Sequence, residues 1–181
     1  LKLIGSKGER GRPIYTDKLD DNLFQPLDNE VQISFSRGDG NEIKGSLDGP
    51  AKMQALHSSS ALSVNVFQYW KQIDQVPAIA AACGFCRRDN KSPERIVFED
   101  KYVIDDSLLG NPPNIDVVIY NAESAVIKRY AIECKFTEAY SSRSHGGLKP
   151  EYLNLTDIWR DIPNIHTFAK SISPEDKSFH H

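Results

Sequence analysis

The sequence predicts an α/β domain, and three observations support that prediction. Two apolar runs, at residues 115–120 and 130–136, have the alternation and β-branched content of strands. The segments 61–70 and 77–82 have the composition of helices that pack against a sheet. The chain has 181 residues, of which 39% are hydrophobic and 26% charged, so it is long enough for one filled core and has the composition of an ordinary globular protein.

Residues 1–50 are expected to form an irregular N-terminal arm and a small hairpin. The first part of this region mixes glycine, proline and charge with little periodicity. The segment 31–35 alternates as a strand does, residues 38–41 are a turn signal, and residues 42–47 offer a partner strand. Residues 51–181 are expected to be the functional core, within one compact domain overall.

Two segments in this core are predicted to be helices. Serines at 58–60 offer an N-cap for the first, although its β-branched residues leave a strand as the alternative. Asn65 is a polar residue in an apolar setting, and it either braces a neighbouring loop or reaches the functional site. Gly84 is expected to mark the end of the second helix.

The three cysteines are expected to be free. An odd number argues against a disulfide framework and is typical of a reducing compartment. Cys83 and Cys86 form a C-x-x-C pair, but there is no second such pair, and Cys134 lies on the core-facing side of the second predicted strand. We predict buried small hydrophobic residues, and a zinc or redox protein built on Cys83 and Cys86 is the rival interpretation.

Charged residues interrupt the two strand-like runs. Asp116 lies early in the first, while Glu133 and Lys135 share one face of the second and Cys134 points the other way. Residues 121–124 can turn the chain, so Asp116 and Glu133 are expected side by side on an antiparallel pair. Two carboxylates suit a hard cation such as Mg²⁺, whereas an exposed Glu133–Lys135 ion pair is the structural alternative.

Pro113 and Asp116, together with Glu133-Cys134-Lys135, resemble the P-D…(D/E)-x-K pattern of the restriction-endonuclease-like nuclease superfamily. The chain departs from that pattern because two residues separate Pro113 from Asp116. The resemblance spans roughly residues 58–169 and is closest to a bacterial branch of nuclease-like proteins without assigned substrates. It implies a restriction-endonuclease-like core with a mixed central β-sheet flanked by helices.

The resemblance also implies a function, which is metal-dependent hydrolysis of phosphodiester bonds with Mg²⁺ or Mn²⁺, on DNA in preference to RNA. Lys135 would act on the nucleophile or on the transition state. Family members commonly add a further acid, and Glu99, after the apolar run 95–98, is preferred to Glu94. The implied oxygen ligands are the carboxylates of Asp116, Glu133 and Glu99 and the backbone carbonyl of Cys134 or Ile132.

The overall charge does not by itself indicate a nucleic-acid-binding protein. A formal net charge of -3 and a pI of about 6.0 disfavour binding by bulk electrostatics, although local basic residues suffice for phosphate contacts. The residues expected to contact nucleic acid are Arg87, Arg88, Lys91 and Arg143, with Arg95, Lys128 and Arg129 nearby. A merely solvent-facing surface is the alternative. A non-catalytic nucleic-acid or protein-binding module is the runner-up function.

The C-terminal part is expected to contain a loop and a helix. Residues 137–150 are rich in Ser, Gly and Arg, and they form either an ordinary connection or a loop that closes over substrate, with residues 141–145 near phosphates. Asp161 and Pro163 predict a helix start, and Pro174 its end. The apolar stripe expected to cover the other face of the sheet comprises Ile162, Ile165, Phe168 and Ala169, and His166 is expected to pack beside it.

The sequence predicts a cytoplasmic protein without a membrane partner. No apolar stretch approaches the roughly 20 residues that span a bilayer, and the N-terminus lacks the apolar region of a secretory signal. A homodimer is an expectation from the resemblance alone. The chain starts at Leu1 and ends at His181, which suggests a missing C-terminal part, and its last two histidines are either a tag remnant or native.

Overall fold

The computed structural model describes residues 2–4, 14–37, 42–47, 49–102, 114–136 and 150–171. The chain divides into two compact units, which we call the sheet unit (Leu1–Tyr102 and Pro113–Phe136) and the helical unit (Val103–Pro112 and Thr137–His181). The expected turn at 38–41, Pro113, Pro174 and the loop at 137–149 lie outside the described residues. The division of the chain after residue 50 stays a prediction.

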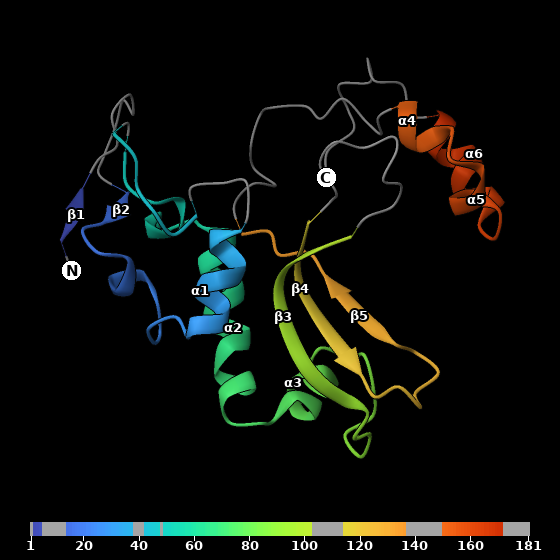
Figure 1. Cartoon of the computed structure of the whole chain (residues 1–181), viewed down its shortest axis with the longest axis horizontal. Coiled ribbons are helices and arrows are strands. Elements are labelled where there is room, and N and C mark those ends of the chain that lie inside the picture. The colour runs from blue at the N-terminus through green and yellow to red at the C-terminus, as the bar shows by residue number, and fades with distance from the viewer. Residues whose placement is uncertain are drawn as a thin grey trace. The chain divides into compact units, whose positions relative to one another are not determined.

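The sheet unit contains two antiparallel sheets and the helices around them (Figure 1). Its helices are α1 (Asn29–Ser36), α2 (Ser59–Gln72) and α3 (Val76–Ala82), with short 3-10 helices at Leu19–Asn22 and Lys52–Gln54. Its strands are β1 (Leu3–Ile4), β2 (Tyr15–Thr16), β3 (Pro93–Lys101), β4 (Asn114–Asn121) and β5 (Arg129–Ile132). The first two strands pair with each other, and the other three form the larger sheet.

The larger sheet has the order β3-β4-β5 and is antiparallel throughout. Its register places Val117 opposite both Phe98 on β3 and Ile132 on β5. The α/β class is therefore confirmed, but the expected mixed sheet is wrong for the described strands. The pair β4–β5 is antiparallel as expected, and β3 also pairs antiparallel with β4, so no described strand of this sheet has a parallel neighbour.

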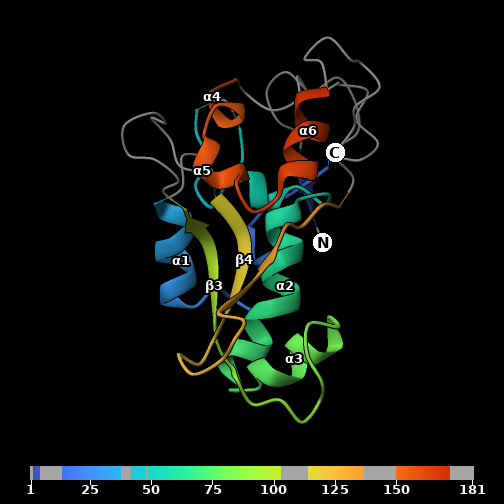
Figure 2. The ribbon, with the colours of Figure 1, turned by 90° about the vertical axis from the view of Figure 1, so that its right-hand side faces the viewer.

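The hydrophobic core lies between this sheet and the helices, which cover one of its faces (Figure 2). The aromatic rings of Phe35 on α1 and Phe98 on β3 pack with their centroids 6.1 Å apart. Burial of each large apolar side chain contributes about 1.5–3 kcal/mol. The sheet and the three helices supply most of this core: Ile96, Phe98, Val117 and Ile119; Val31 and Phe35; Val64 and Phe67; and Val76 and Ile79.

The expected strand at 31–35 is wrong, because this segment is helix α1. The side chain of Asp28 caps the helix by accepting a hydrogen bond from the backbone N–H of Val31 at 2.8 Å. Val31 and Phe35 lie four residues apart on the buried face, and residues at this spacing share one face of a helix as well as one face of a strand. The hairpin with residues 42–47 is consequently wrong as well, and Ser46 forms an isolated bridge to Gly49.

The two helices expected in the core are confirmed, and the strand alternative for 61–70 is wrong. Ser58 caps α2 by accepting a hydrogen bond from the N–H of Ala61 at 3.1 Å. Gly84 follows the end of α3 with φ of +78°, the left-handed conformation in which glycine commonly ends helices.

Asn65 and Gln68 on α2 fasten the irregular segment at residues 22–28. Asn65 accepts a hydrogen bond from the N–H of Phe24 at 2.6 Å and donates one to the carbonyl of Asn22 at 3.0 Å. Gln68 likewise accepts from the N–H of Asp28 at 3.0 Å and donates to the carbonyl of Pro26 at 2.9 Å. Asn65 therefore braces a loop, which was one of its two expected roles.

All three cysteines are free, but they are not all buried. Cys86 and Cys134 are partly buried and pack against the core, as expected. Cys83 is exposed, so its predicted burial is wrong, because it is the C-cap residue of α3 and the end of the helix reaches solvent there.

The helical unit contains α4 (Pro150–Leu153), α5 (Thr156–Trp159) and α6 (Pro163–Ser171). The predicted C-terminal helix and the packing role of His166 are confirmed. The His166 ring stacks on Trp159 at a centroid distance of 4.8 Å, and its Nε2 lies 2.8 Å from the carbonyl oxygen of Leu153. Coverage of the sheet by this helix stays a prediction. No helix in the described part of the chain is long and apolar enough to cross a membrane.

Replacement of Asn65 by alanine should lower the free energy of unfolding by about 1–3 kcal/mol, because it leaves the backbone groups of residues 22 and 24 without partners. Val66→Ala, at the next and more exposed position of α2, should change it by less than about 0.5 kcal/mol. Urea denaturation followed by circular dichroism measures both values. Equal effects of the two substitutions would contradict the bracing role.

Candidate active site

The hairpin of β4 and β5 brings Asp116 next to the E-x-K segment. Val117 pairs with Ile132, so the next positions along the two chains are Asp116 and Glu133. The backbone N–H of Cys134 donates a hydrogen bond to Asp116 Oδ2 at 2.6 Å. The predicted strand 130–136 is therefore too long, because β5 ends at Ile132. Beyond that residue, the N–H of Cys134 binds the side chain of Asp116 instead of a backbone carbonyl of the neighbouring strand.

Glu99 lies on β3 opposite Asp116, between the paired positions Phe98–Val117 and Asp100–Ile115. Its φ angle is +50°, in the left-handed region, which costs a residue with a Cβ roughly 1–2 kcal/mol. Asn114 Nδ2 donates a hydrogen bond to Glu99 Oε2 at 3.3 Å. A strained backbone that the surrounding sheet holds in place is often found at functional sites.

Electrostatics connect Glu99 with three other carboxylates. Its pKa is raised from 4.5 to about 7, first by burial and then by the negative charges of Asp116, Glu42 and Glu133, while the hydrogen bond from Asn114 opposes this shift. Repulsion of this kind requires that the acids lie close to Glu99. Acids from β3, from β4, from the residue that follows β5 and from the N-terminal region thus all bear on the charge of Glu99.

Glu42 is the member of this group that the sequence did not identify. It lies on the partly buried N-terminal segment, where its Oε1 pairs with Lys52 Nζ at 3.1 Å and its Oε2 accepts a hydrogen bond from Ser60 Oγ at 3.1 Å. No local motif distinguishes it, and the expected hairpin had assigned it to a strand. Only the spatial proximity to Glu99 gives it a place in the site.

Lys135 and Glu133 form an ion pair with 2.6 Å between Nζ and Oε1. This is the pairing that the structural alternative for E-x-K expected. The two side chains are 42% and 53% exposed, and a pair exposed to this degree contributes at most about 1 kcal/mol. Such a pair is easily rearranged when a ligand approaches.

The donors of the site fit a hard cation in their chemistry. They are carboxylate oxygens together with Asn114 Oδ1, which is buried with no hydrogen-bond partner in the described part of the chain, and Mg²⁺ prefers such oxygen ligands. Among the described residues, however, no three His, Cys, Asp or Glu side chains are already gathered so that they could hold an ion. The carboxylates would have to converge when a cation binds.

Cys134 contributes through its backbone rather than its thiol. Burial, together with the charges of Asp116 and Glu133, raises the pKa of the thiol to about 11, against the opposing effect of Lys135. The sulfur therefore stays protonated near neutral pH and is a poor metal ligand. Its carbonyl oxygen remains a candidate ligand, as the resemblance implies.

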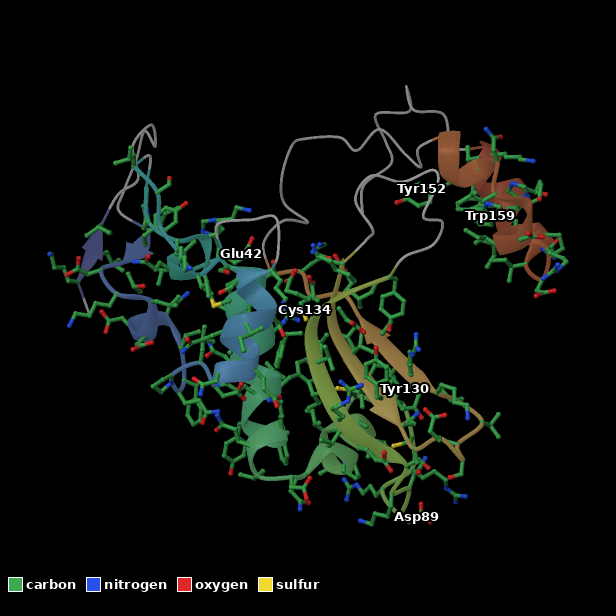
Figure 3. All side chains as sticks on the ribbon, in the orientation of Figure 1. Glu42, Asp89, Tyr130, Cys134, Tyr152 and Trp159 are labelled. Carbon is green, nitrogen blue, oxygen red and sulfur yellow. The ribbon has the colours of Figure 1, made fainter. Side chains whose placement is uncertain are left out.

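The basic residues lie near the other end of the sheet. Arg87, Arg88 and Lys91 are exposed in the loop between α3 and β3. Figure 3 shows Asp89 of this loop far from Cys134, at the opposite end of the sheet. Glu94 is also at the start of β3, away from the acids, and Arg143 lies outside the described residues.

Comparison with known families gives the class of the protein. Residues 4–173 match the model of the family REase-ARP, described as Restriction Endonuclease associating with ARP. The match covers most of the chain and places it among restriction-endonuclease-like proteins. The chain belongs to the REase-ARP family. Searches among curated proteins and among solved structures gave no match.

The family description is coarser than the sequence-based expectation. It points to a nuclease in general and to an interaction with DNA. It names neither the D…E-x-K motif nor a metal, so the site residues stay predictions.

The Glu99→Gln variant should reveal the raised pKa of Glu99. A carboxyl group whose pKa is about 7 when folded and 4.5 when unfolded makes folding less favourable as the pH rises through this range. The wild type should therefore lose stability relative to Glu99→Gln between about pH 4.5 and pH 7. Urea denaturation at pH 5 and pH 8 measures this difference.

The matched control is Glu94→Gln, the same chemical change on the same strand at an exposed position. It should alter stability little at either pH. The proposed acid cluster is wrong if Glu99→Gln and Glu94→Gln show the same dependence on pH.

Proposed function

We propose that the protein is a metal-dependent nuclease of the D…E-x-K type, on a restriction-endonuclease-like core, that hydrolyses phosphodiester bonds in DNA in preference to RNA. The observation that carries the proposal is the proximity of Glu99, Asp116 and Glu133, which come from β3, β4 and the end of β5. Membership of a restriction-endonuclease family supports it independently.

The residues that would hold Mg²⁺ or Mn²⁺ are Asp116, Glu133 and Glu99, with the backbone carbonyl of Cys134 or Ile132. A bound divalent ion would polarise the phosphate and lower the pKa of a bound water. Hard oxygen donors suit either metal. Glu42, held by Lys52 and Ser60, adds negative charge at the border of this group.

The side chains around the acids have positioning roles in this proposal. The N–H of Cys134 orients the Asp116 carboxylate, and Asn114 orients that of Glu99. Lys135 would orient the attacking water and stabilise the charge that develops on the phosphate. Its ammonium group lies beside Glu133, one of the proposed metal ligands.

Arg87, Arg88, Lys91 and Arg143 would contact the nucleic-acid backbone. Arg95, just beyond the loop that carries the first three, precedes Glu99 by four strand residues, or about 13 Å at about 3.3 Å per residue. That separation corresponds to about four base pairs of B-form DNA. The loop would therefore contact phosphates several nucleotides from the bond that is cut. Cytoplasmic localisation and a homodimer stay predictions.

A non-catalytic binding module is the second candidate. The observation that favours it is the Glu133–Lys135 ion pair, together with the lack of a gathered ligand group among the described residues. The same absence weighs against the zinc interpretation of Cys83 and Cys86 within the described part of the chain.

Cleavage assays with a panel of DNA and RNA substrates test the proposed activity. With Mg²⁺ or Mn²⁺ the wild type should cut DNA, and EDTA should abolish cutting. Lys135→Ala should lower the rate at least about 100-fold, the scale expected when a group that stabilises transition-state charge is lost. Lys18→Ala, which removes an exposed lysine in the N-terminal region, remote in sequence from Lys135, should cut as the wild type does.

A rate for Lys135→Ala within a few-fold of the wild type would exclude its proposed role. If the folded wild type binds nucleic acid equally well with and without Mg²⁺ and cuts nothing, the binding-module interpretation replaces the nuclease.

The triple variant Arg87→Ala, Arg88→Ala, Lys91→Ala tests the backbone contact. Each phosphate contact contributes about 0.9 to the slope of log affinity against log salt concentration for double-stranded DNA. The variant should therefore bind DNA more weakly at low salt. Because it lacks three cations, the slope of log affinity against log salt concentration should be shallower by up to about 2.7. Fluorescence anisotropy across a salt series measures it, and an unchanged slope would show that this loop only faces solvent.

A further inference from the structure

We propose that a pocket at the β4–β5 turn binds a nucleobase that carries an exocyclic amino group. The pocket lies away from the acids, because Asn121 follows Asp116 by five strand residues, or about 17 Å. Figure 3 places Tyr130 and Asp89 towards this end of the sheet. The inference rests on the proposed function only in taking nucleic acid as a source of the base.

The pocket has a volume of about 190 Å³. This is below the roughly 300–1,000 Å³ of pockets that hold drug-sized ligands, so a group of one or two rings suits it. Its lining combines the polar side chains of Asn90, Ser92 and Asn121 with the turn residues 125–127 and the ring of Tyr130. Among the described residues, the lining contains no charged side chain, which favours a neutral group.

Asn121 supplies an unused hydrogen-bond acceptor. The residue is only 8% exposed, and its Nδ2 donates to the carbonyl of Ile127 at 2.8 Å. Its Oδ1 is buried, with no hydrogen-bond partner among the residues that the structure describes. Exchanging the amide nitrogen and oxygen would bring two oxygens together, so the Ile127 contact fixes the orientation. An unpaired buried acceptor is unfavourable, and a ligand with an N–H donor would satisfy it.

Tyr130 is the aromatic residue that lines the pocket beside this acceptor. It is held by stacking on Phe85, with ring centroids 5.0 Å apart and an angle of 10° between the planes. Ala125 and Ile127 add aliphatic surface. A flat, neutral ring with an amino donor satisfies both features, and flipped or single-stranded bases are bound by this combination of stacking and hydrogen bonding.

Two lysines adjoin the neutral lining of the pocket in the sequence. Exposed Lys91 lies between the lining residues Asn90 and Ser92. Lys128, also exposed, follows Ile127, and its Nζ donates a hydrogen bond to the carbonyl of Glu123. A neutral pocket bordered by cations is complementary to a nucleotide, whose base is neutral and whose phosphate is anionic.

Titration of the wild type with mononucleotides in EDTA tests the proposal without any cleavage. Cytidine and adenosine monophosphates carry an exocyclic amino group, whereas uridine and inosine monophosphates carry an oxygen at that position. The amino-bearing nucleotides should bind at least about tenfold more tightly, because a site that needs a hydrogen bond rejects the analogue that lacks it. Equal affinities, or no binding at millimolar concentrations, would overturn the proposal.

Short single strands of deoxycytidine and of deoxyuridine, tested in the same way, identify the source of the base. Preference for deoxycytidine in both formats supports a base within DNA, and preference among mononucleotides alone supports a free nucleotide. Cleavage with unselective binding would overturn this inference and leave the proposed nuclease standing, whereas selective binding without cleavage would do the reverse.

Ala125→Leu tests the location, since it fills the pocket and leaves the hydrogen bond of Asn121 in place. It should abolish binding of cytidine monophosphate, and Ala131→Leu, the same change outside the pocket on β5, should not. Asn121→Ala should remove the preference for amino groups, and circular dichroism would show whether the turn still folds. Unchanged binding by Ala125→Leu would exclude this pocket.

Discussion

The candidate site depends on the register of one hairpin. The pairing of Val117 with Ile132 places Asp116 beside Glu133, and the N–H of Cys134 then binds the Asp116 carboxylate. A slip by one residue would turn every side chain of β5 to the opposite face and separate the acids. Burial of Val117 and of its neighbours on the core face makes that slip unfavourable, so the hydrophobic core holds the chemical groups in place.

The sequence predicted the parts of the fold whose signals are local. A capping serine and a terminal glycine gave α2 and α3, and the strand content of residues 115–120 gave β4. The strand predicted at 31–35 was wrong because buried residues four apart, such as Val31 and Phe35, fit the periodicity of a helix as well as that of a strand. The N-cap supplied by Asp28 is the feature that favours the helix. The predicted burial of Cys83 was wrong because the burial of a helix end depends on tertiary packing.

The same distinction applies to the site. Asp116 and Glu133 were placed together because a short turn between two strands has few possible geometries. Glu42 is remote in sequence and carries no motif, so nothing short of the folded chain brings it to Glu99. The buried acceptor of Asn121 was equally invisible, since an asparagine at a strand end ordinarily indicates a turn.

Glu99 lowers the stability of the fold at the position that it occupies in β3. A glycine there would relieve the left-handed backbone, and any neutral residue would remove the repulsion from the other carboxylates. Glutamate is thus unfavourable at this position on two independent grounds. A residue that reduces stability on both grounds is expected where activity, rather than stability, determines which side chain occupies a position.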